Sequence, residues 1–263
     1  MLKFLCPGLP ALFLIAFAGS TAAQAPSCSA VSGQSTVALL ELYTSEGCDS
    51  CPPADRWVGE LGKRGFGSDR VVPIALHVDY WDYLGWKDPY ARATFTARQR
   101  EVVKLGGGSV VYTPQILVNG RDYRRWSSAS SFASDLKAIN DRSARATIAL
   151  SYKPGGQSTA EVTAVVTNID PAHRADAALH VAFYEDGLSS SVTAGENKGA
   201  RLKHDRVVRE WFGPFGVDGG GRIDLHRAVT LPPRSRISGA VAFVQNRRNA
   251  EILQALDVPA CSI

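Results

Sequence analysis

The sequence predicts an α/β domain over residues 30–143, followed by a mostly antiparallel β-sandwich-like domain over residues 144–263. In the first half, short apolar runs alternate with segments of helical periodicity, which is the pattern of buried strands joined by helices. In the second half, apolar and polar residues alternate between polar turns, as in antiparallel sheets with one buried face. A chain of 263 residues is also long enough for two domains.

The first three elements of the α/β half surround a pair of cysteines. "TVALLELY" at 36–43 and "RVVPIALHV" at 70–78 each predict a strand buried on both faces. Between them, "ADRWVGELGKRG" at 54–65 places its apolar residues at helical spacing and ends in a glycine. A strand–helix–strand order of this kind predicts a parallel strand pair.

A helix, a hairpin and a closing helix complete this half. Asp88 is a good N-cap, so a helix is expected from there to the next glycine run. "QILV" at 115–118 predicts a third strand, and Asn119-Gly120 predicts a tight turn from which "RDYRRW" returns. A helix over 128–140 follows. The resulting β-α-β-α-β-β-α order matches the minimal thioredoxin arrangement, so we predict a thioredoxin-like domain.

The second half carries the period-two alternation of strands that have one buried face. The segment 193–211 has no pattern that decides between strand, loop and helix. The expected strands cover residues 146–152, 161–167, 178–184, 222–229 and 237–243.

The beginning of the chain predicts export. Lys3 precedes a short apolar run that ends in small residues, which is typical of a secretory signal peptide, here residues 1–23. The alternative is an N-terminal membrane anchor. Beyond this segment no stretch is apolar enough to span a bilayer. We therefore expect the mature protein in the periplasm or secreted, with no membrane span after cleavage.

Export places four cysteines in an oxidising compartment, where disulfides form. The sensible pairing joins Cys48 to Cys51 and Cys28 to Cys261. The second bond would tie the two ends of the mature chain together and act as a structural disulfide; the alternative is two unpaired thiols. The formal charge of +4 is small and the chain contains no run of Lys or Arg, so nucleic acid is an unexpected partner.

The stretch "GCDSCPP" predicts redox chemistry. Cys48 lies between a strand and a helix, where free backbone N–H groups and the helix dipole favour the thiolate over the thiol. Such a thiolate attacks a substrate disulfide, and Cys51 then resolves the mixed disulfide. Asp49 opposes the thiolate, so we expect a weak oxidant. Because prolines follow Cys51 directly, the helix can also begin after both cysteines, which weakens the dipole effect.

Other residues are predicted to lie near this pair. Pro114 stands directly before the third strand, and we expect a cis peptide bond after Thr113 that aligns a substrate; the alternative is a trans proline that begins an edge strand. His77 and Asp79 are candidates for moving protons, although His77 is equally explained as a core histidine. Glu41 is a candidate proton acceptor for Cys51, or a carboxylate paired with a nearby base.

An aromatic segment follows the second strand. Tyr80, Trp81, Tyr83 and Trp86 leave the carboxyl end of that strand, at the sheet edge where ligands bind in open α/β sheets. Tyr80, Trp81 and Trp86 are therefore candidates for the wall of a substrate groove. The alternative is that they pack against the β-rich half.

Several motifs together carry a family resemblance. They are "LYTSEGCDSCPPAD", "HVDYWDYLGWKDPYA", "FTARQR", "YTPQILVNG" and "GENKG". Together they resemble an uncharacterised group of exported bacterial proteins, the domain of unknown function 1223. The resemblance covers nearly the whole mature chain and implies a thioredoxin-like fold with an added β-rich part. It implies no reaction, because fold analogy alone does not assign chemistry.

Three functions fit the sequence. The leading hypothesis is a thiol–disulfide oxidoreductase without a cofactor, in which Cys48, Cys51 and Pro114 act on exported proteins or small thiols with disulfides, together with a redox partner protein. The second is a copper(I)-handling module in which Cys48 and Cys51 bind the metal with His77 or His204 as a third ligand. The third is a non-catalytic binding protein in which the Cys48–Cys51 disulfide is static.

Overall fold

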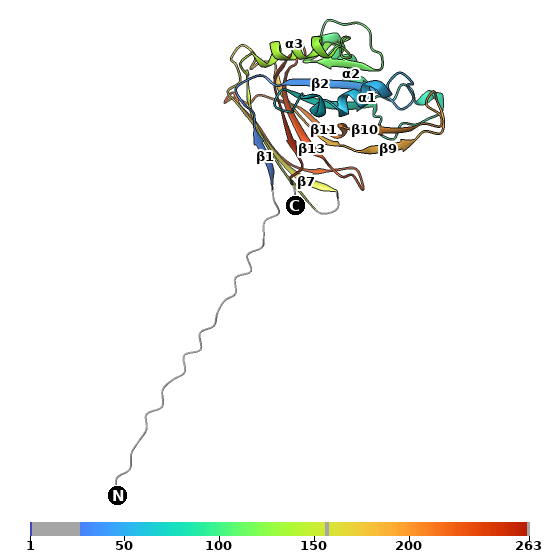
Figure 1. Ribbon diagram of the computed structural model, residues 1–263. Coiled ribbons are helices and arrows are strands. Elements are labelled where there is room, and N and C mark those ends of the chain that lie inside the picture. The colour runs from blue at the N-terminus through green and yellow to red at the C-terminus, as the bar shows by residue number, and fades with distance from the viewer. Residues whose placement is uncertain (2–26, 156–157, 262–263) are drawn as a thin grey trace.

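The computed structural model describes residues 1, 27–155 and 158–261 (Figure 1). The predicted signal peptide, residues 1–23, lies outside the described residues except for residue 1. Three α-helices occur in the described chain: α1 (Pro52–Gly59), α2 (Ala93–Leu105) and α3 (Ala129–Asn140). In Figure 1 they gather at one end of the molecule, and the rest is mostly β structure.

One eight-stranded sheet runs through the molecule. Strands β2 (Ala38–Thr44) and β3 (Val71–His77) pair in parallel, and β4 (Gln115–Val118) pairs antiparallel to β2. The sheet order is β14-β13-β8-β11-β3-β2-β4-β5. The other members of this sheet are β5 (Arg121–Asp122), β8 (Ala177–Glu185), β11 (Val207–Gly216), β13 (Gly239–Asn246) and β14 (Ile252–Pro259).

The predicted fold class, a thioredoxin-like α/β domain followed by a β-sandwich-like domain, is wrong. The chain is mostly β, and strands from both predicted halves form the same sheet. The strand that joins them is β11, which pairs in parallel with β3 at Val207 and Ala75. The amide of Ala75 donates to the carbonyl of Arg206 at 2.8 Å. β11 begins within the segment that had no decisive sequence pattern, so the sequence did not reveal that the edge of β3 is covered.

The helices lie on opposite faces of the β2–β4 region. Side chains of a strand alternate between its faces, so Leu40 and Leu42 pack with the core residues of α1 and α3, such as Val58 and Leu136. Leu39 and Tyr43 point to the other face, where residues of α2 pack. This arrangement fixes which side chains of β2 can reach the segment that contains the two cysteines.

A four-stranded sheet, in the order β1-β6-β7-β12, covers part of the large sheet. Its alternating residues, such as Leu150 and Val162, pack in one cluster with Leu179 and Val181 of β8. Its strands are β1 (Cys28–Val31), β6 (Thr147–Pro154), β7 (Thr159–Thr167) and β12 (Ile223–Thr230). A separate two-stranded sheet is formed by β9 (Leu188–Ser191) and β10 (Arg201–His204). β10 runs beside α1.

The predicted disulfide between Cys28 and Cys261 is confirmed, with Cα atoms 5.3 Å apart and a sequence separation of 233. Cys28 is buried in the cluster between the two sheets, and Cys261 packs against that cluster. The bond therefore holds β1 and the end of the described chain together.

Most predicted elements exist close to their expected positions, but the start of α2 differs. The helix begins at Ala93 with Arg92 as its N-cap, and not at Asp88. The Asp88 carboxylate is buried and accepts hydrogen bonds from the amides of Glu46 and Tyr90. The Asp88 carboxylate therefore holds the loop before the CxxC motif in place.

The predicted hairpin turn is confirmed at Asn119 and Gly120, whose φ angles are 48° and 76°. The Asn119 side chain accepts a hydrogen bond from the amide of Leu39 at 2.9 Å. A Cβ atom on Gly120 would lie 2.2 Å from the carbonyl oxygen of Ala250. Glycine is thus required there by both the left-handed backbone and the close approach.

Candidate functional site

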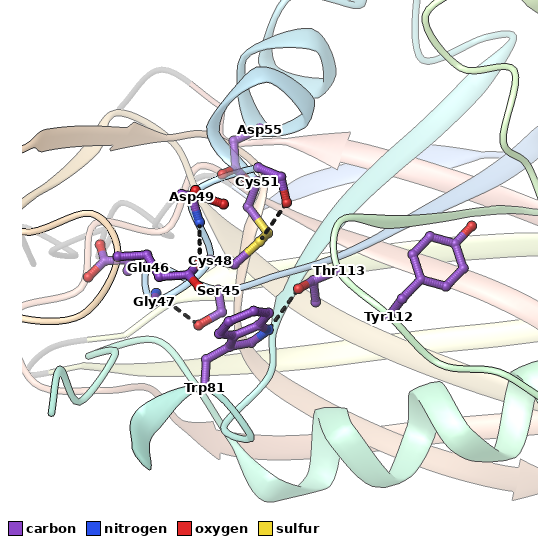
Figure 2. Close-up of a disulfide and its surroundings, with 12 residues drawn as sticks. Ser45, Glu46, Gly47, Cys48, Asp49, Cys51, Asp55, Trp81, Tyr112 and Thr113 are labelled. Atoms are coloured by element: carbon purple, nitrogen blue, oxygen red, sulfur yellow. Dashed lines mark hydrogen bonds between the residues drawn. A yellow bond between two sulfur atoms is a disulfide. The ribbon is translucent and has the colours of Figure 1, made fainter. Parts of the chain in front are cut away.

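The CxxC motif lies at the start of α1 and forms a disulfide between Cys48 and Cys51, whose Cα atoms are 5.5 Å apart (Figure 2). Cys51 is the N-cap of α1, and Pro52 and Pro53 open the helix. The motif therefore forms a turn before the helix. In this arrangement the helix dipole favours the Cys48 thiolate less than it would if the helix began at Cys48. Both cysteines are 0% exposed, although Asp49 and Ser50 between them are exposed.

The Thr113–Pro114 peptide bond is cis, as predicted. Trp81 connects this loop to the cysteines. Its indole Nε1 donates to Thr113 Oγ1 at 2.8 Å, and Figure 2 shows both residues beside the disulfide. A Cβ atom on Gly47 would lie 2.9 Å from Trp81 Cβ, so the residue before Cys48 must be small. The aromatic segment, the CxxC loop and the cis-proline loop thus form one packed unit.

The other aromatic candidates have different surroundings. The Trp86 indole donates to Glu46 Oε2 at 2.8 Å, and the Tyr80 hydroxyl donates to Gln99 Oε1 at 3.3 Å. Tyr83 is 78% exposed. A separate groove of about 400 Å³ begins at Pro114 and is lined by Val110, Tyr112, Ile116, Arg124 and Trp126. Of the predicted wall, Trp81 contacts the cis-proline loop directly.

Glu41 is paired with a base. Its Oε1 atom accepts hydrogen bonds from Arg98 Nε at 2.7 Å and from the Tyr43 hydroxyl at 3.0 Å, and Glu41 and Arg98 are buried. Because Glu41 and Tyr43 are two residues apart in β2, they share the face that packs against α2, whereas α1 lies on the other face. The structure therefore supports the ion-pair interpretation of Glu41 over the proton acceptor.

His77 and Asp79 are engaged by other groups. His77 Nδ1 lies 2.7 Å from Asp88 Oδ2, and both side chains are fully buried. Asp79 Oδ1 accepts a hydrogen bond from Thr96 Oγ1 of α2 at 2.6 Å. Asp79 thus holds the segment after β3 to α2.

A buried group of acids and histidines lies behind the CxxC motif, and we call it the acid–histidine cluster. Glu46 precedes the CxxC motif in the same loop, and its Oε1 atom lies 2.9 Å from His204 Nε2. His204 Nδ1 lies 3.9 Å from Asp55 Oδ2 of α1. The rings of His77 and His204 are 4.9 Å apart. The cluster consists of Glu46, Asp55, His77, Asp88 and His204.

Burial and neighbouring charges shift the pKa values of three of its members. Burial raises the pKa of Asp55, and His204 and His77 oppose that effect. Burial by itself would lower the pKa of His77, but the adjacent Asp88 carboxylate outweighs it and the pKa is raised. Burial would raise the pKa of Asp88, but His77 and the two backbone amides lower it. His77 and Asp88 therefore form a stable ion pair, whereas Asp55 resists ionisation.

The loop between β9 and β10 closes over the CxxC segment. Asn197 Nδ2 donates to the carbonyls of Glu46 and Cys48, each at 2.9 Å. Glu196 Oε2 accepts from the amide of Asp49 at 3.1 Å. The flanking Gly195 and Gly199 have φ angles of 74° and 87°. This loop contains the "GENKG" motif, to which the sequence had assigned no role.

Most of this site gives no signal in the sequence. No role was assigned to Asp55 from the sequence, and Asp88 resembled an N-cap. Glu46 and Asn197 carried no signal beyond their presence in the family motifs. In the described part of the chain no group of three or more His, Cys, Asp or Glu side chains is arranged to hold a metal ion. His77 and His204 instead contact carboxylates, so the copper(I) hypothesis gains no third ligand.

The fold and site define a class of protein in which a second sheet packs against a mixed sheet. In this class a buried CxxC disulfide lies at the start of a helix. The model of the family described as protein of unknown function (DUF1223) matches residues 39–245. The chain therefore belongs to this family, as the motifs predicted. No helix in the described residues is long and apolar enough to cross a membrane.

Two solved structures are similar to the chain. A protein of Agrobacterium tumefaciens, solved by X-ray crystallography, is 26% identical with a TM-score of 0.62 and is covered over 88% of this chain and 98% of its own. HBP35 of Porphyromonas gingivalis is 14% identical with a TM-score of 0.67, over 88% of this chain and 79% of its own, which indicates a shared fold alone. No curated protein matches the chain.

Proposed function

We propose that this protein is a thiol–disulfide oxidoreductase of the periplasm or the secreted fraction, and that Cys48 and Cys51 exchange electrons with disulfides of exported proteins or small thiols. The observation that carries the proposal is the setting of the Cys48–Cys51 bond. The bond joins cysteines with a sequence separation of only 3, and it lies beside a cluster of buried titratable groups. A bond this local stabilises a fold little, whereas perturbed titratable groups concentrate at reactive sites.

The exchange uses both sulfurs. In the reduced protein the Cys48 thiolate attacks one sulfur of a substrate disulfide, and the other substrate sulfur leaves as a thiol after taking up a proton. Cys51 then loses its proton and attacks Cys48, which re-forms the protein disulfide and releases the second substrate thiol. Two electrons pass from the protein to the substrate, and the reverse sequence oxidises a substrate dithiol. The groove that begins at Pro114 is where we place the substrate chain.

The complete burial of both cysteines favours one competing function, a static disulfide in a binding protein. For exchange to occur, the loop between β9 and β10 or the Trp81 segment has to move. The two functions therefore differ in how readily the bond is reduced in the folded protein.

A redox titration of the folded protein separates them. The protein is equilibrated with dithiothreitol or glutathione buffers, alkylated, and each cysteine pair is quantified by mass spectrometry. We expect Cys48–Cys51 to be reduced at a potential above about −300 mV, in the range of exchangeable disulfides. If this bond resists reduction until the chain unfolds, the protein is not an oxidoreductase. Cys48→Ser should also abolish turnover in an insulin-reduction assay.

A further inference from the structure

We infer that His204, on the β9–β10 hairpin, is a positioning residue that receives the Cys51 proton through Asp55 during thiol–disulfide exchange, with Glu46 as its partner. This inference rests on the proposed function and deepens it. It gives a role to a residue more than 150 positions from the CxxC motif, brought to α1 by β10.

The contacts of His204 define which ring nitrogen is free. The side chain is 2% exposed, and Nε2 lies 2.9 Å from Glu46 Oε1. Because a carboxylate oxygen accepts, Nε2 carries the hydrogen. Nδ1 of a neutral ring therefore presents a lone pair. This Nδ1 atom is buried and has no hydrogen-bond partner, and Asp55 Oδ2 is 3.9 Å away.

In the proposed route, Asp55 stands between His204 and the resolving cysteine. It lies one helical turn after Cys51, and its amide donates to the Cys51 carbonyl at 3.2 Å. Figure 2 shows the Asp55 side chain beside Cys51. Burial raises the pKa of Asp55, so this carboxyl takes up a proton more readily than an ordinary aspartate does.

The groups that face His204 come from several elements. Glu46 approaches from the CxxC loop and Asp55 from α1. The ring of His77, paired with Asp88, stands 4.9 Å away on β3. The Tyr90 ring lies 5.7 Å away. Glu46 and Asp55 are the two acidic residues that the His204 ring nitrogens face.

The proton transfer balances with the exchange. Cys51 gives its proton to the Asp55 carboxylate, and its sulfur attacks Cys48 while the substrate thiolate leaves. When Asp55 and His204 close the remaining distance, the proton passes to Nδ1, and Glu46 stabilises the imidazolium that forms. The proton then passes from His204 back through Asp55 to the departing substrate thiolate; otherwise the thiolate takes a proton from solvent and His204 releases its own proton to solvent. No additional oxidant or reductant is required.

A purely structural histidine would not need this arrangement, because buried polar atoms normally have partners. Glutamine at position 204 can preserve one hydrogen bond to Glu46, but it cannot take up a proton at Nδ1. His204→Gln therefore separates a structural role from proton transfer. His226→Gln is the matched control, since His226 contacts Thr163 on the four-stranded sheet.

The test measures each half of the exchange separately. Reduced full-length protein is mixed with glutathione disulfide between pH 5.5 and 9, quenched with acid and analysed by mass spectrometry. The first attack is measured in a Cys51→Ser background, and resolution is measured as loss of the glutathionylated intermediate. We expect His204→Gln to slow resolution at pH 6–7 by about tenfold, less than the hundredfold or more typical of a direct general base. The first attack should be unchanged.

Resolution in Asp55→Asn should be slowed at least as much, and adding His204→Gln to it should cause no further loss. His226→Gln should match the wild type throughout. An unchanged pH profile of resolution in His204→Gln, or additive losses with Asp55→Asn, would overturn the inference. If His204→Gln does not fold, Glu46→Gln provides the second variant, with the same expected effect on resolution alone. If the wild type does not react with glutathione disulfide at all, the proposed function itself fails.

Discussion

The two disulfides of this protein have opposite settings. Cys28–Cys261 spans 233 residues and lies in an apolar cluster between two sheets. Cys48–Cys51 spans 3 residues and lies beside buried carboxylates and histidines. The first disulfide closes a very long loop and is surrounded by apolar core residues. The second closes a very short loop and is surrounded by groups that can transfer protons. The difference teaches that a disulfide's loop length and its neighbours together distinguish structural from reactive bonds.

The largest expected effect concerns stability. Replacing Cys28 and Cys261 together with serine should lower the free energy of unfolding by about 5 kcal/mol, because it releases a very long loop in the unfolded chain. The same change at Cys48 and Cys51 should cost about 2 kcal/mol by the same reasoning. Urea denaturation of the two double variants measures both values. Equal losses of unfolding free energy in the two double variants would contradict the proposed difference between the two disulfides.

The next effect concerns the ion pair beside the reactive bond. Asp88→Asn removes one partner of the buried His77–Asp88 pair and should cost about 3 kcal/mol. His77 has a raised pKa, so its contribution is complete below its ordinary value and is lost as the pH rises through the folded value. Asp88 has a lowered pKa, so its contribution is lost as the pH falls through the folded value.

The cost of Asp88→Asn should therefore be greatest between about pH 4 and 6.5, the ordinary values of the two groups, and should shrink at higher pH. Urea denaturation at pH 5.5 and pH 9 checks this. Asp141→Asn, in an exposed pair with Lys137, serves as the control and should show little change at either pH. A cost that does not vary with pH would mean that the pair adds no charge-dependent stability.

A smaller effect concerns access to the reactive bond. Asn197→Ala removes two hydrogen bonds from the loop to the carbonyls of Glu46 and Cys48. Since each bond contributes about 1 kcal/mol, reduction of Cys48–Cys51 by dithiothreitol should accelerate about tenfold or more. Cys28–Cys261 should react as before. Asn249→Ala, which removes a turn contact to Glu251, is the control and should change neither rate. If Asn197→Ala leaves the rate unchanged, this loop does not cover the disulfide.

The sequence predicted local features better than their assembly. The Asn119-Gly120 turn, the cis bond at Pro114 and the Cys48–Cys51 disulfide follow from short-range chemistry, and Cys28–Cys261 is the pair that remains. The fold class was wrong because apolar alternation shows which residues are buried but not which strands pair. β11 lacks a clean alternation, contains register shifts and a cis Gly213–Pro214 bond, and yet joins the two halves.

The candidate site was predicted only in part for the same reason. Cys48, Cys51 and Pro114 were found because motif spacing is visible along the chain. The acid–histidine cluster was not found, because Glu46 and His204 are brought together by strand pairing far from the motif. A histidine in a β-rich segment gives no sign of such a partner until the sheet is known.

The smallest expected effect tests whether the reactive bond's surroundings reduce stability in favour of chemistry. A carboxyl with a raised pKa binds its proton more tightly in the folded state, so stability falls as the pH rises through the raised value of Asp55. Asp55→Asn removes this cost and should raise the free energy of unfolding at pH 8 by about 1 kcal/mol, as single stabilising changes at functional sites often do. The gain should shrink as the pH falls towards about 4, the ordinary value of an aspartate, and should vanish below it, where the carboxyl is protonated in both states.

The matched control for this variant is Asp186→Asn. The pKa of Asp186 is also raised by desolvation, but this residue is exposed, its carboxylate accepts from the Arg206 amide, and it does not contact the acid–histidine cluster. Because solvent screens an exposed carboxylate, Asp186→Asn should gain less stability at pH 8 than Asp55→Asn, and only Asp55→Asn should slow resolution of a mixed disulfide. Thermal unfolding and the quenched exchange assay, run on the same preparations, give both quantities. A destabilised Asp55→Asn would show that its carboxylate is held by favourable contacts, and the contrast between the two disulfides would then rest on loop length alone.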